Sequence, residues 1–113
     1  MSQSQQRKGR GGELELVKLL QQHGIPAEPG QPASFGSTPD VVGVPGIHVE
    51  VKRVERLNVP EAMAQAARDA SRFGDGTPAL FHRRNRSPWL VTMQLEDWLK
   101  LYQSGQKCPI FPI

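Results

Sequence analysis

The sequence predicts an α/β (α+β) domain in which a central mixed β-sheet of about five strands is flanked by helices. Three segments show a helical period, and several short runs have the composition or alternation of strands. The 113 residues suit a single domain. The patterns follow the order helix, three strands, helix, two strands, helix. Elements in this order bury their apolar faces when the helices pack against the sheet.

The first predicted helix covers residues 12–23, and Gly24 ends it. A basic arm at residues 1–11 precedes it and is expected to be flexible, because glycine, serine and glutamine dominate its composition. The folded domain is expected over residues 12–104, and a proline-rich tail follows at residues 105–113.

The phase of the first helix separates its two glutamates. At about 100° per residue, the apolar side chains form one stripe, which consists of Leu16, Val17 and Leu20. Glu13 falls on the centre line of the stripe, and Glu15 points roughly the opposite way. We therefore expect Glu13 to face the protein and Glu15 to be an ordinary surface acid.

Two central strands are predicted on either side of a tight turn at Pro45-Gly46. They cover residues 40–44 and 47–53, and the second alternates apolar and polar side chains. A short strand near residues 25–28 precedes them, followed by an irregular loop at residues 28–39 that is rich in proline and glycine.

Three charged side chains meet if the two central strands pair as a hairpin. Side chains of a strand have a period of two, so Glu50 and Lys52 share one face. Asp40 would then approach Glu50 from the neighbouring strand. Such a cluster lowers stability unless a cation or a substrate uses it.

The second helix is predicted from an N-cap at Asn58 to about Arg72, with Pro60 in the first turn and Glu61 at the capping-box position. Gln65 is assigned to the same face as Glu61. Small residues on the opposite face favour close packing on the sheet, and they are Ala62, Met63, Ala66, Ala67, Ala70 and Phe73.

Two further strands, at residues 79–84 and 89–93, are predicted with a basic tip between them at residues 83–87. A last amphipathic helix follows, with apolar residues spaced i, i+3, i+4 and i+7 at Leu95, Trp98, Leu99 and Tyr102. We expect this helix to cover the core and to bury both of its aromatic residues.

The charge balance suits a polyanionic partner such as nucleic acid. The chain has 14 lysines and arginines against 11 acids, a formal net charge of +3. The single cysteine, Cys108, excludes an internal disulfide and a cysteine-rich zinc site. The sequence contains no apolar run long enough to span a membrane and does not begin as a signal peptide does, so a cytoplasmic protein without a membrane partner is expected.

Two short motifs and their order resemble the PD-(D/E)XK nuclease superfamily. They are Gly36-Ser37-Thr38-Pro39-Asp40 and Glu50-Val51-Lys52, and a helix that carries Gln65 follows them. The sequence is most similar to the archaeal-type Holliday junction resolvases and their phage relatives. Those open with Lys-Gly-x-x-x-Glu, as Lys8-Gly9-Arg10-Gly11-Gly12-Glu13 does here. The likeness covers roughly residues 7–101 and implies a restriction-endonuclease-like core.

The resemblance implies an endodeoxyribonuclease that uses Mg²⁺, for which Mn²⁺ can substitute. The catalytic residues it implies are Glu13, Asp40, Glu50, Lys52 and Gln65. Asp40, Glu50 and the carbonyl of Val51 would hold the metal, because hard divalent cations prefer oxygen ligands. Glu13 would complete the acidic cluster or hold a second ion. Lys52 would orient or deprotonate the attacking water, or stabilise the transition state as a cation. Gln65 would touch the water or a phosphate.

DNA contacts are expected from two residues of the first motif, Ser37 and Thr38, and from several basic side chains. The basic residues are Arg7, Lys8, Arg10, Arg53, Arg56, Arg83, Arg84 and Arg86. Contacts of this kind give salt-dependent affinity with little sequence reading. The resemblance implies four-way or otherwise branched DNA as substrate, a homodimer that makes paired cuts, and a bacterial or phage role in recombination or repair.

Other interpretations remain open. A nuclease of the same superfamily could act on another substrate as a nicking or replication-repair enzyme, and a non-catalytic DNA-binding protein could keep the same fold. Taken singly, Asp40 is also typical of a turn, and the Glu50–Lys52 pair is typical of a solvated strand face. His48 shares a strand face with Glu50 and could be drawn in as a ligand, although such a histidine is more often a polar surface residue. Clustered acids repel phosphates, so binding alone does not require them.

Overall fold

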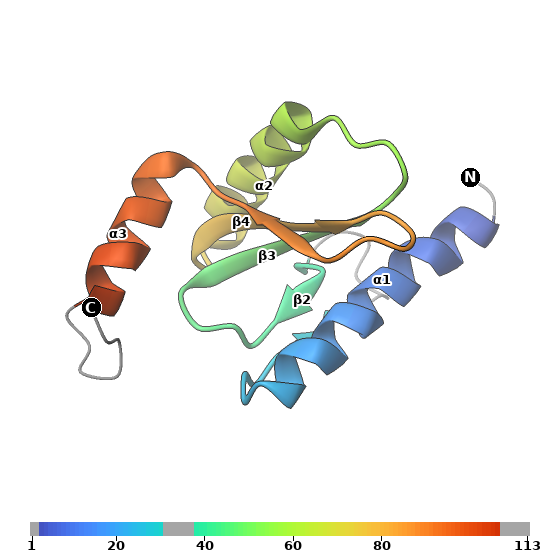
Figure 1. The fold of residues 1–113 in the computed structure, drawn as a ribbon, viewed down its shortest axis with the longest axis horizontal. Coiled ribbons are helices and arrows are strands. Elements are labelled where there is room, and N and C mark those ends of the chain that lie inside the picture. The colour runs from blue at the N-terminus through green and yellow to red at the C-terminus, as the bar shows by residue number, and fades with distance from the viewer. Residues whose placement is uncertain (1–2, 31–37, 107–113) are drawn as a thin grey trace.

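The computed structural model describes the backbone of residues 3–30 and 38–106, and the side chains of residues 11–30 and 38–106. Within these ranges the chain forms a five-stranded mixed sheet with three helices (Figure 1), which confirms the predicted fold class. The predicted DNA contact Ser37 lies outside the described residues, as do the side chains of Arg7, Lys8 and Arg10.

The elements follow the predicted order: α1 (Gln3–Gln22), β1 (Glu28–Pro29), β2 (Val41–Val42), β3 (Ile47–Arg53), α2 (Val59–Phe73), β4 (Thr77–Arg83), β5 (Leu90–Thr92) and α3 (Leu95–Gln106). The strands lie side by side in the order β1-β2-β3-β4-β5. Strands β3 and β4 are parallel, and the other neighbours are antiparallel. The crossover between the two parallel strands is α2, as parallel pairing requires.

Helix α2 has the ends that its sequence predicts. The side chain of Asn58 accepts a hydrogen bond of 3.1 Å from the backbone N–H of Glu61. At the other end Gly74 adopts φ +62° and donates to the carbonyl of Ala70 at 2.8 Å. Glycine suits this position because it enters the left-handed region without steric cost.

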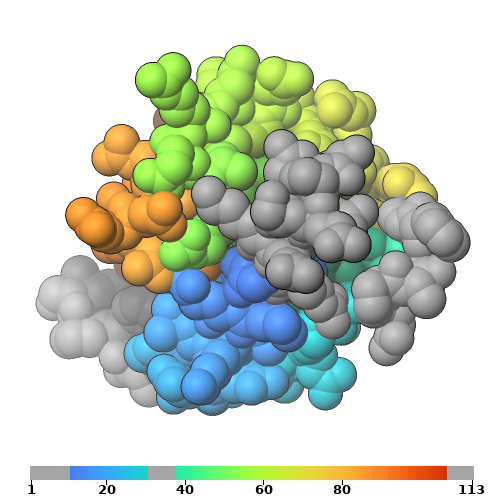
Figure 2. Space-filling view, turned by 90° about the vertical axis from the view of Figure 1, so that its right-hand side faces the viewer, coloured from blue at the N-terminus to red at the C-terminus, as the bar shows by residue number. Residues whose placement is uncertain are grey.

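The two faces of the sheet carry different helices. Figures 1 and 2 show α1 (blue) on one side of the sheet and α2 (green) on the other. The α1 side forms an apolar core of buried residues, which are Leu16, Val17, Ala27, Val41, Val49 and Val51. On the α2 side the helix buries only alanines, Ala62, Ala66 and Ala70. Their small side chains let the helix lie close to the sheet.

A close backbone contact at Gly30 holds the start of β2. The N–H of Gly30 donates to the carbonyl of Asp40 at 2.9 Å. A Cβ at Gly30 would lie only 1.9 Å from the carbonyl oxygen of Pro39, so no larger residue fits there without a shift of the backbone. This contact fixes Asp40 at the start of β2.

Two predictions about the helices are wrong. Helix α1 begins at Gln3, so residues 3–11 of the expected flexible arm are helical. Glutamine, lysine and arginine are good helix formers, and here they outweigh the cost of about 1 kcal/mol for each glycine in the segment. Helix α3 does not cover the core. It has no buried residue, and Trp98 and Tyr102 are 46% and 50% exposed.

No helix within the described ranges has the length and apolar character that crossing a membrane would require.

Candidate functional site

Strand β3 carries the candidate site because its alternate side chains face opposite helices. Val49 and Val51 belong to the core on the α1 side. His48, Glu50 and Lys52 alternate with them and therefore face α2. His48 is 1% exposed and Glu50 is 5% exposed, so titratable groups lie inside the domain.

Asp40 lies opposite Glu50. Strands β2 and β3 are antiparallel with Val41 paired to Val49, so one further step places Asp40 across from Glu50. Residues directly opposite in an antiparallel pair share a face, with Cβ atoms about 4.5–5.5 Å apart. One carboxylate oxygen of Asp40 also lies 3.5 Å from the backbone N–H of Val51, which donates to it. The register therefore brings Asp40 close to Glu50, as the hairpin prediction expected.

His48 links Glu50 to a further acid. Its Nε2 lies 3.0 Å from Oε1 of Glu50, and its Nδ1 lies 2.9 Å from Oδ1 of Asp75. The imidazole also stacks on Phe73, with ring centroids 6.1 Å apart. His48 is therefore a buried bridge between two carboxylates, and the assignment of His48 to a polar surface is wrong.

Helix α2 contributes a carboxylate that the sequence analysis missed. Ligand atoms of His48, Glu50 and Asp69 all lie within 4.8 Å of one another. Asp69 lies three residues after Ala66 and four before Phe73, on the small-residue face of α2. An acid on an apolar helix face was the signal that identified Glu13, and the same signal identifies Asp69.

Burial and like charges disfavour ionisation of the clustered acids. Burial is the main cause that raises the pKa of Asp40, and the charge of Asp69 adds to it, whereas the Val51 N–H and Lys52 act in the opposite direction. Burial is also the main cause that raises the pKa of Glu50. The hydrogen bond with His48 acts in the opposite direction, and the charges of Asp40 and Asp69 raise the pKa further. The site thus holds more negative charge than the fold stabilises, which is the condition a bound cation would relieve.

For His48 a raised pKa favours the charged form, whereas for Asp40 and Glu50 it favours the neutral form. Burial by itself lowers the pKa of His48, but the hydrogen bonds to Glu50 and Asp75 outweigh burial and raise it above the ordinary value. A charged His48 would neutralise part of the acidic cluster from within the protein.

The remaining predicted catalytic residues lie around this cluster. Lys52 is half-buried on the same strand face as Glu50, and its charge acts on Asp40. Gln65 is half-buried one turn before Asp69. Glu13 is half-buried beside Gly12, where α1 approaches Arg53 so closely that an added Cβ would lie 2.8 Å from the Arg53 side chain. Neither Glu13 nor the predicted metal ligand Asp40 belongs to the three-residue group within 4.8 Å.

Glu15 is not an ordinary surface acid, contrary to the prediction. Its carboxylate accepts hydrogen bonds from the guanidinium of Arg83 and from Nε1 of Trp89, the latter at 3.0 Å. Nε of Arg53 lies 3.4 Å from its other oxygen. Glu15 therefore ties α1 to the ends of β3 and β4, and two of the predicted DNA-binding arginines are engaged in this network.

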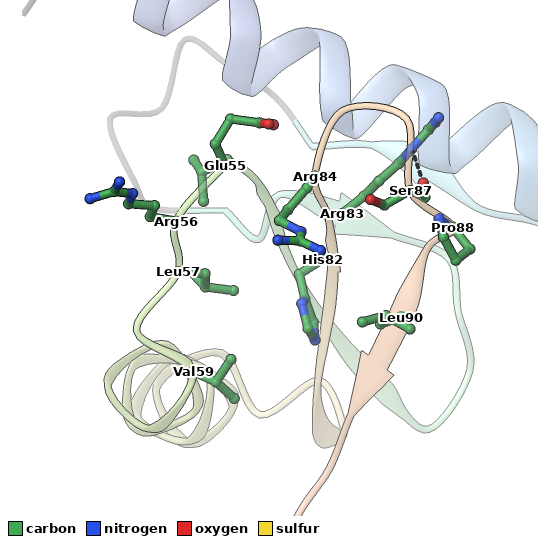
Figure 3. Close-up of a pocket in the computed structure, with 11 residues that line it drawn as sticks. Glu55, Arg56, Leu57, Val59, His82, Arg83, Arg84, Ser87, Pro88 and Leu90 are labelled. Carbon is green, nitrogen blue, oxygen red and sulfur yellow. Dashed lines mark hydrogen bonds between the residues drawn. The ribbon is translucent and has the colours of Figure 1, made fainter.

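The two predicted basic groups meet at the carboxyl ends of β3 and β4. Arg56, Arg83 and Arg84 line a cavity of about 520 Å³ that also includes His82 (Figure 3). Figure 3 shows Arg84 directed toward His82 and Arg56 directed outward, while Arg83 donates to the carbonyl of Ser87 at 2.7 Å. Arg86 and Thr38 complete the predicted contacts within the described residues; the former is exposed and the latter half-buried.

Comparisons of the chain with protein-family models, curated proteins and solved structures found no match. Function must therefore be argued from the site itself.

Proposed function

We propose that this protein is a metal-dependent DNA endonuclease of the PD-(D/E)XK type, most like a Holliday junction resolvase. One observation carries the proposal: Val41 pairs with Val49 across antiparallel strands, so that Asp40, one residue before β2, comes opposite Glu50, and Lys52 shares the face of Glu50. Two acids and an ammonium in this arrangement suit hydrolysis of a phosphodiester. A stabilising role alone does not explain them, because burial opposes ionisation of both acids.

The donor set fits a hard divalent cation. Asp40, Glu50 and the Val51 carbonyl would hold Mg²⁺ or Mn²⁺, and Asp69 offers a further oxygen close to Glu50. A bound ion would supply charge stabilisation at the phosphate and a more acidic water. His48 would orient the Glu50 carboxylate through its hydrogen bond, as partners of metal ligands commonly do.

The other side chains would act on the water and on the DNA. Lys52 would orient or deprotonate the attacking water, or stabilise the charge that develops on the phosphate. Glu13 and Gln65 would contribute from α1 and α2, at the edges of the cluster. Arg56 and Arg84 would contact backbone phosphates beside the cavity at the ends of β3 and β4.

We infer branched DNA as the substrate, from the resemblance and from the absence of a base-reading motif in the sequence. Paired cuts in a four-way junction need two active sites, so the enzyme would act as a homodimer. A role in recombination or repair, in a bacterial or phage-infected cytoplasm, follows from the same resemblance.

Cleavage of defined DNA substrates tests the proposal. Labelled four-way junction, flap, single-stranded and linear duplex DNA are incubated with the protein in Mg²⁺, Mn²⁺ or EDTA. Symmetric metal-dependent cuts in the junction alone are expected, whereas cleavage of linear DNA would indicate another nuclease of the same superfamily. Tight binding without cutting in either metal would overturn the enzymatic proposal in favour of a DNA-binding protein.

Variants of the cluster make the same assay specific. Asp40→Asn should abolish cleavage and keep DNA binding, because it removes a charge that repels phosphate. Lys52→Ala should slow cleavage by about 100-fold or more. Glu28→Gln is the matched control and should cut normally, since Glu28 is exposed on β1 and belongs neither to the cluster nor to the predicted catalytic residues. Near-normal cleavage by Asp40→Asn would exclude Asp40 as a metal ligand.

A further inference from the structure

The cavity at the carboxyl ends of β3 and β4 is large enough to hold a small ligand. Its volume of about 520 Å³ falls within the ~300–1,000 Å³ that is usual for ligand pockets. The loop after β3, the start of α2 and the β4–β5 hairpin all contribute to its lining (Figure 3). Three separate segments of the chain therefore enclose this space.

The strand register places the cavity next to Lys52. Lys52 pairs with His82 on β4, and His82 pairs with Leu90 on β5. His82 and Leu90 both line the cavity, and neighbouring strands lie about 4.8 Å apart. Val59, the first residue of α2, lines it as well. The cavity therefore lies on the α2 side of the sheet, as the acidic cluster does, and a ligand in it would lie beside that cluster.

The apolar part of the lining suits the faces of a nucleobase. Its residues are Val54, Leu57, Val59, Pro88 and Leu90. Figure 3 shows Leu57 and Leu90 on opposite sides of the space, with Arg84 and His82 between them. Proteins that take a base out of its stack hold the base between side chains of this apolar kind.

His82 offers a hydrogen bond to the edge of such a base. Its Nε2 lies 2.8 Å from Oγ1 of Thr92, which holds the ring and leaves Nδ1 as the ring nitrogen for a ligand. Burial lowers the pKa of His82, so the neutral ring is favoured. A nitrogen of neutral imidazole donates or accepts one hydrogen bond, and base edges carry both donors and acceptors.

Two arginines of the lining are available for a phosphate. Arg83 is tied to Glu15, whereas Arg56 and Arg84 form no ion pair with any residue that the structure describes. Glu55, the acid of the lining, accepts a hydrogen bond of 2.7 Å from a backbone N–H of the β4–β5 turn. A guanidinium can bind two phosphate oxygens through parallel N–H groups.

We propose that this cavity binds one nucleotide, with its base between Leu57 and Leu90 and its phosphate at Arg56 and Arg84. An apolar ligand would leave both arginines without a partner, and a bare phosphate would leave the apolar walls without one, whereas a nucleotide uses both. For the source of the nucleotide the inference rests on the proposed function: it would be an unpaired nucleotide of the DNA, beside the phosphate that is cut. A free mononucleotide has the same chemistry, and the experiment separates the two sources.

Titration of the full chain with dAMP in EDTA, where metal-dependent cleavage does not occur, tests the proposal. NMR spectra should show shifts at the cavity residues, and deoxyribose 5-phosphate, which lacks the base, should bind at least about fivefold more weakly. Leu90→Ala and Arg84→Gln should each raise the dissociation constant for dAMP at least about fivefold.

Two matched controls should bind dAMP as the wild type does. Val91→Ala changes the next residue of β5, which is 54% exposed against 55% for Leu90 and points to the opposite face. Arg68→Gln removes an exposed arginine of α2 that does not line the cavity.

Competition identifies the source of the nucleotide. A short single-stranded oligonucleotide should displace dAMP, and an oligonucleotide of abasic residues should displace it much less, if the cavity takes a nucleotide of DNA. Binding of dAMP that neither oligonucleotide displaces would assign the cavity to a free mononucleotide and contradict its role beside the cut.

Two results would overturn the proposal. One is the absence of dAMP binding at millimolar concentration together with equal binding of the normal and the abasic oligonucleotide. The other is binding that Leu90→Ala and Arg84→Gln leave unchanged while circular dichroism shows both variants folded, which is expected because both residues are exposed. Base-dependent binding without DNA cleavage would support this inference and contradict the proposed function, whereas cleavage without binding in the cavity would contradict this inference alone.

Discussion

Asp69→Asn gives the sharpest test of the acidic cluster, because it removes one charge and keeps the shape of the side chain. The charge of Asp69 disfavours ionisation of both Asp40 and Glu50. Removing it should therefore stabilise the metal-free protein. It should also weaken the response to a divalent cation, since one nearby oxygen ligand loses its charge.

The size of the effect follows from the geometry. Ligand atoms of Asp69 and Glu50 lie within 4.8 Å, and two unit charges at that separation repel by about 3 kcal/mol at an effective dielectric constant near 20. Asp69 is half-exposed, so water and salt reduce the repulsion to about 1–2 kcal/mol. For a domain of this size, that corresponds to a rise of about 4–8 °C in Tm.

The pH dependence has a definite sign. The folded-state pKa of Glu50 is raised above its ordinary value of 4.5, so folding favours the protonated carboxyl. The cost of ionising it is absent at low pH and appears as pH rises through the folded-state pKa. The gain from Asp69→Asn should therefore be largest above the folded-state pKa of Glu50 and should shrink as the pH falls through it.

Thermal unfolding in EDTA, at neutral and at mildly acidic pH, measures this gain, with Glu28→Gln as a control for loss of an exposed carboxylate. Titration with Mn²⁺ then measures the metal response. A ligand at 100 times its Kd stabilises by about 2.7 kcal/mol, and Asp69→Asn should show a smaller rise in Tm than wild type. A lower Tm for Asp69→Asn in EDTA at neutral pH would refute the repulsion argument.

Two further substitutions test the structure around the site. Glu15→Gln should destabilise the fold by about 1–3 kcal/mol in urea unfolding, because Arg83 and Arg53 lose a charged partner, whereas Lys18→Gln on the exposed side of α1 should stay within about 0.5 kcal/mol. Gly30→Ala should also destabilise, by more than about 2 kcal/mol, because its Cβ would collide with the Pro39 carbonyl. Gly11→Ala, where nothing lies within 4 Å, should instead stabilise α1 by up to about 1 kcal/mol. Equal effects of the two glycine substitutions would contradict the steric explanation.

The order and type of the elements were predictable because they depend on local pattern. The period of two in β3 placed Glu50 and Lys52 on one face, and the turn at Pro45-Gly46 set the hairpin that brings Asp40 opposite Glu50. The caps of α2 were equally local, since Asn58 bonds within its own first turn.

The rest of the cluster depends on how α2 docks on the sheet. In the sequence, His48 is one of the polar residues of an alternating strand. Only the packing of α2 over β3 buries it between Glu50 and Asp75. The sequence shows that Asp69 is an acid on an apolar helix face, but it does not show which residues of the sheet Asp69 approaches. The prediction for Glu15 was wrong for a similar reason. The helix phase gives the direction in which its side chain points, but the arginines that contact Glu15 come from β3 and β4.

Helix α3 shows a different limit of sequence patterns. The spacing of Leu95, Trp98 and Tyr102 correctly predicts an amphipathic helix, but it does not say what covers the apolar face. The strand order places β5 at the edge of the sheet, and the helix that follows it does not pack on the core. Amphipathic character at such a position indicates an interface as readily as a core.

The position of the cluster in the sheet argues that it is kept for function. Strand β3 is buried over its centre, and a strand covered on both faces is usually apolar throughout. Replacing buried ionic groups by apolar residues of similar volume is often neutral or stabilising. Here the α1 side follows that rule with Val49 and Val51, while the α2 side does not. The alanines of α2 leave room for His48, Glu50 and Asp69 where larger residues would fill the core. A sheet that packs well on one face and holds repelling acids on the other has a stability cost, and the use of those acids proposed above would offset it.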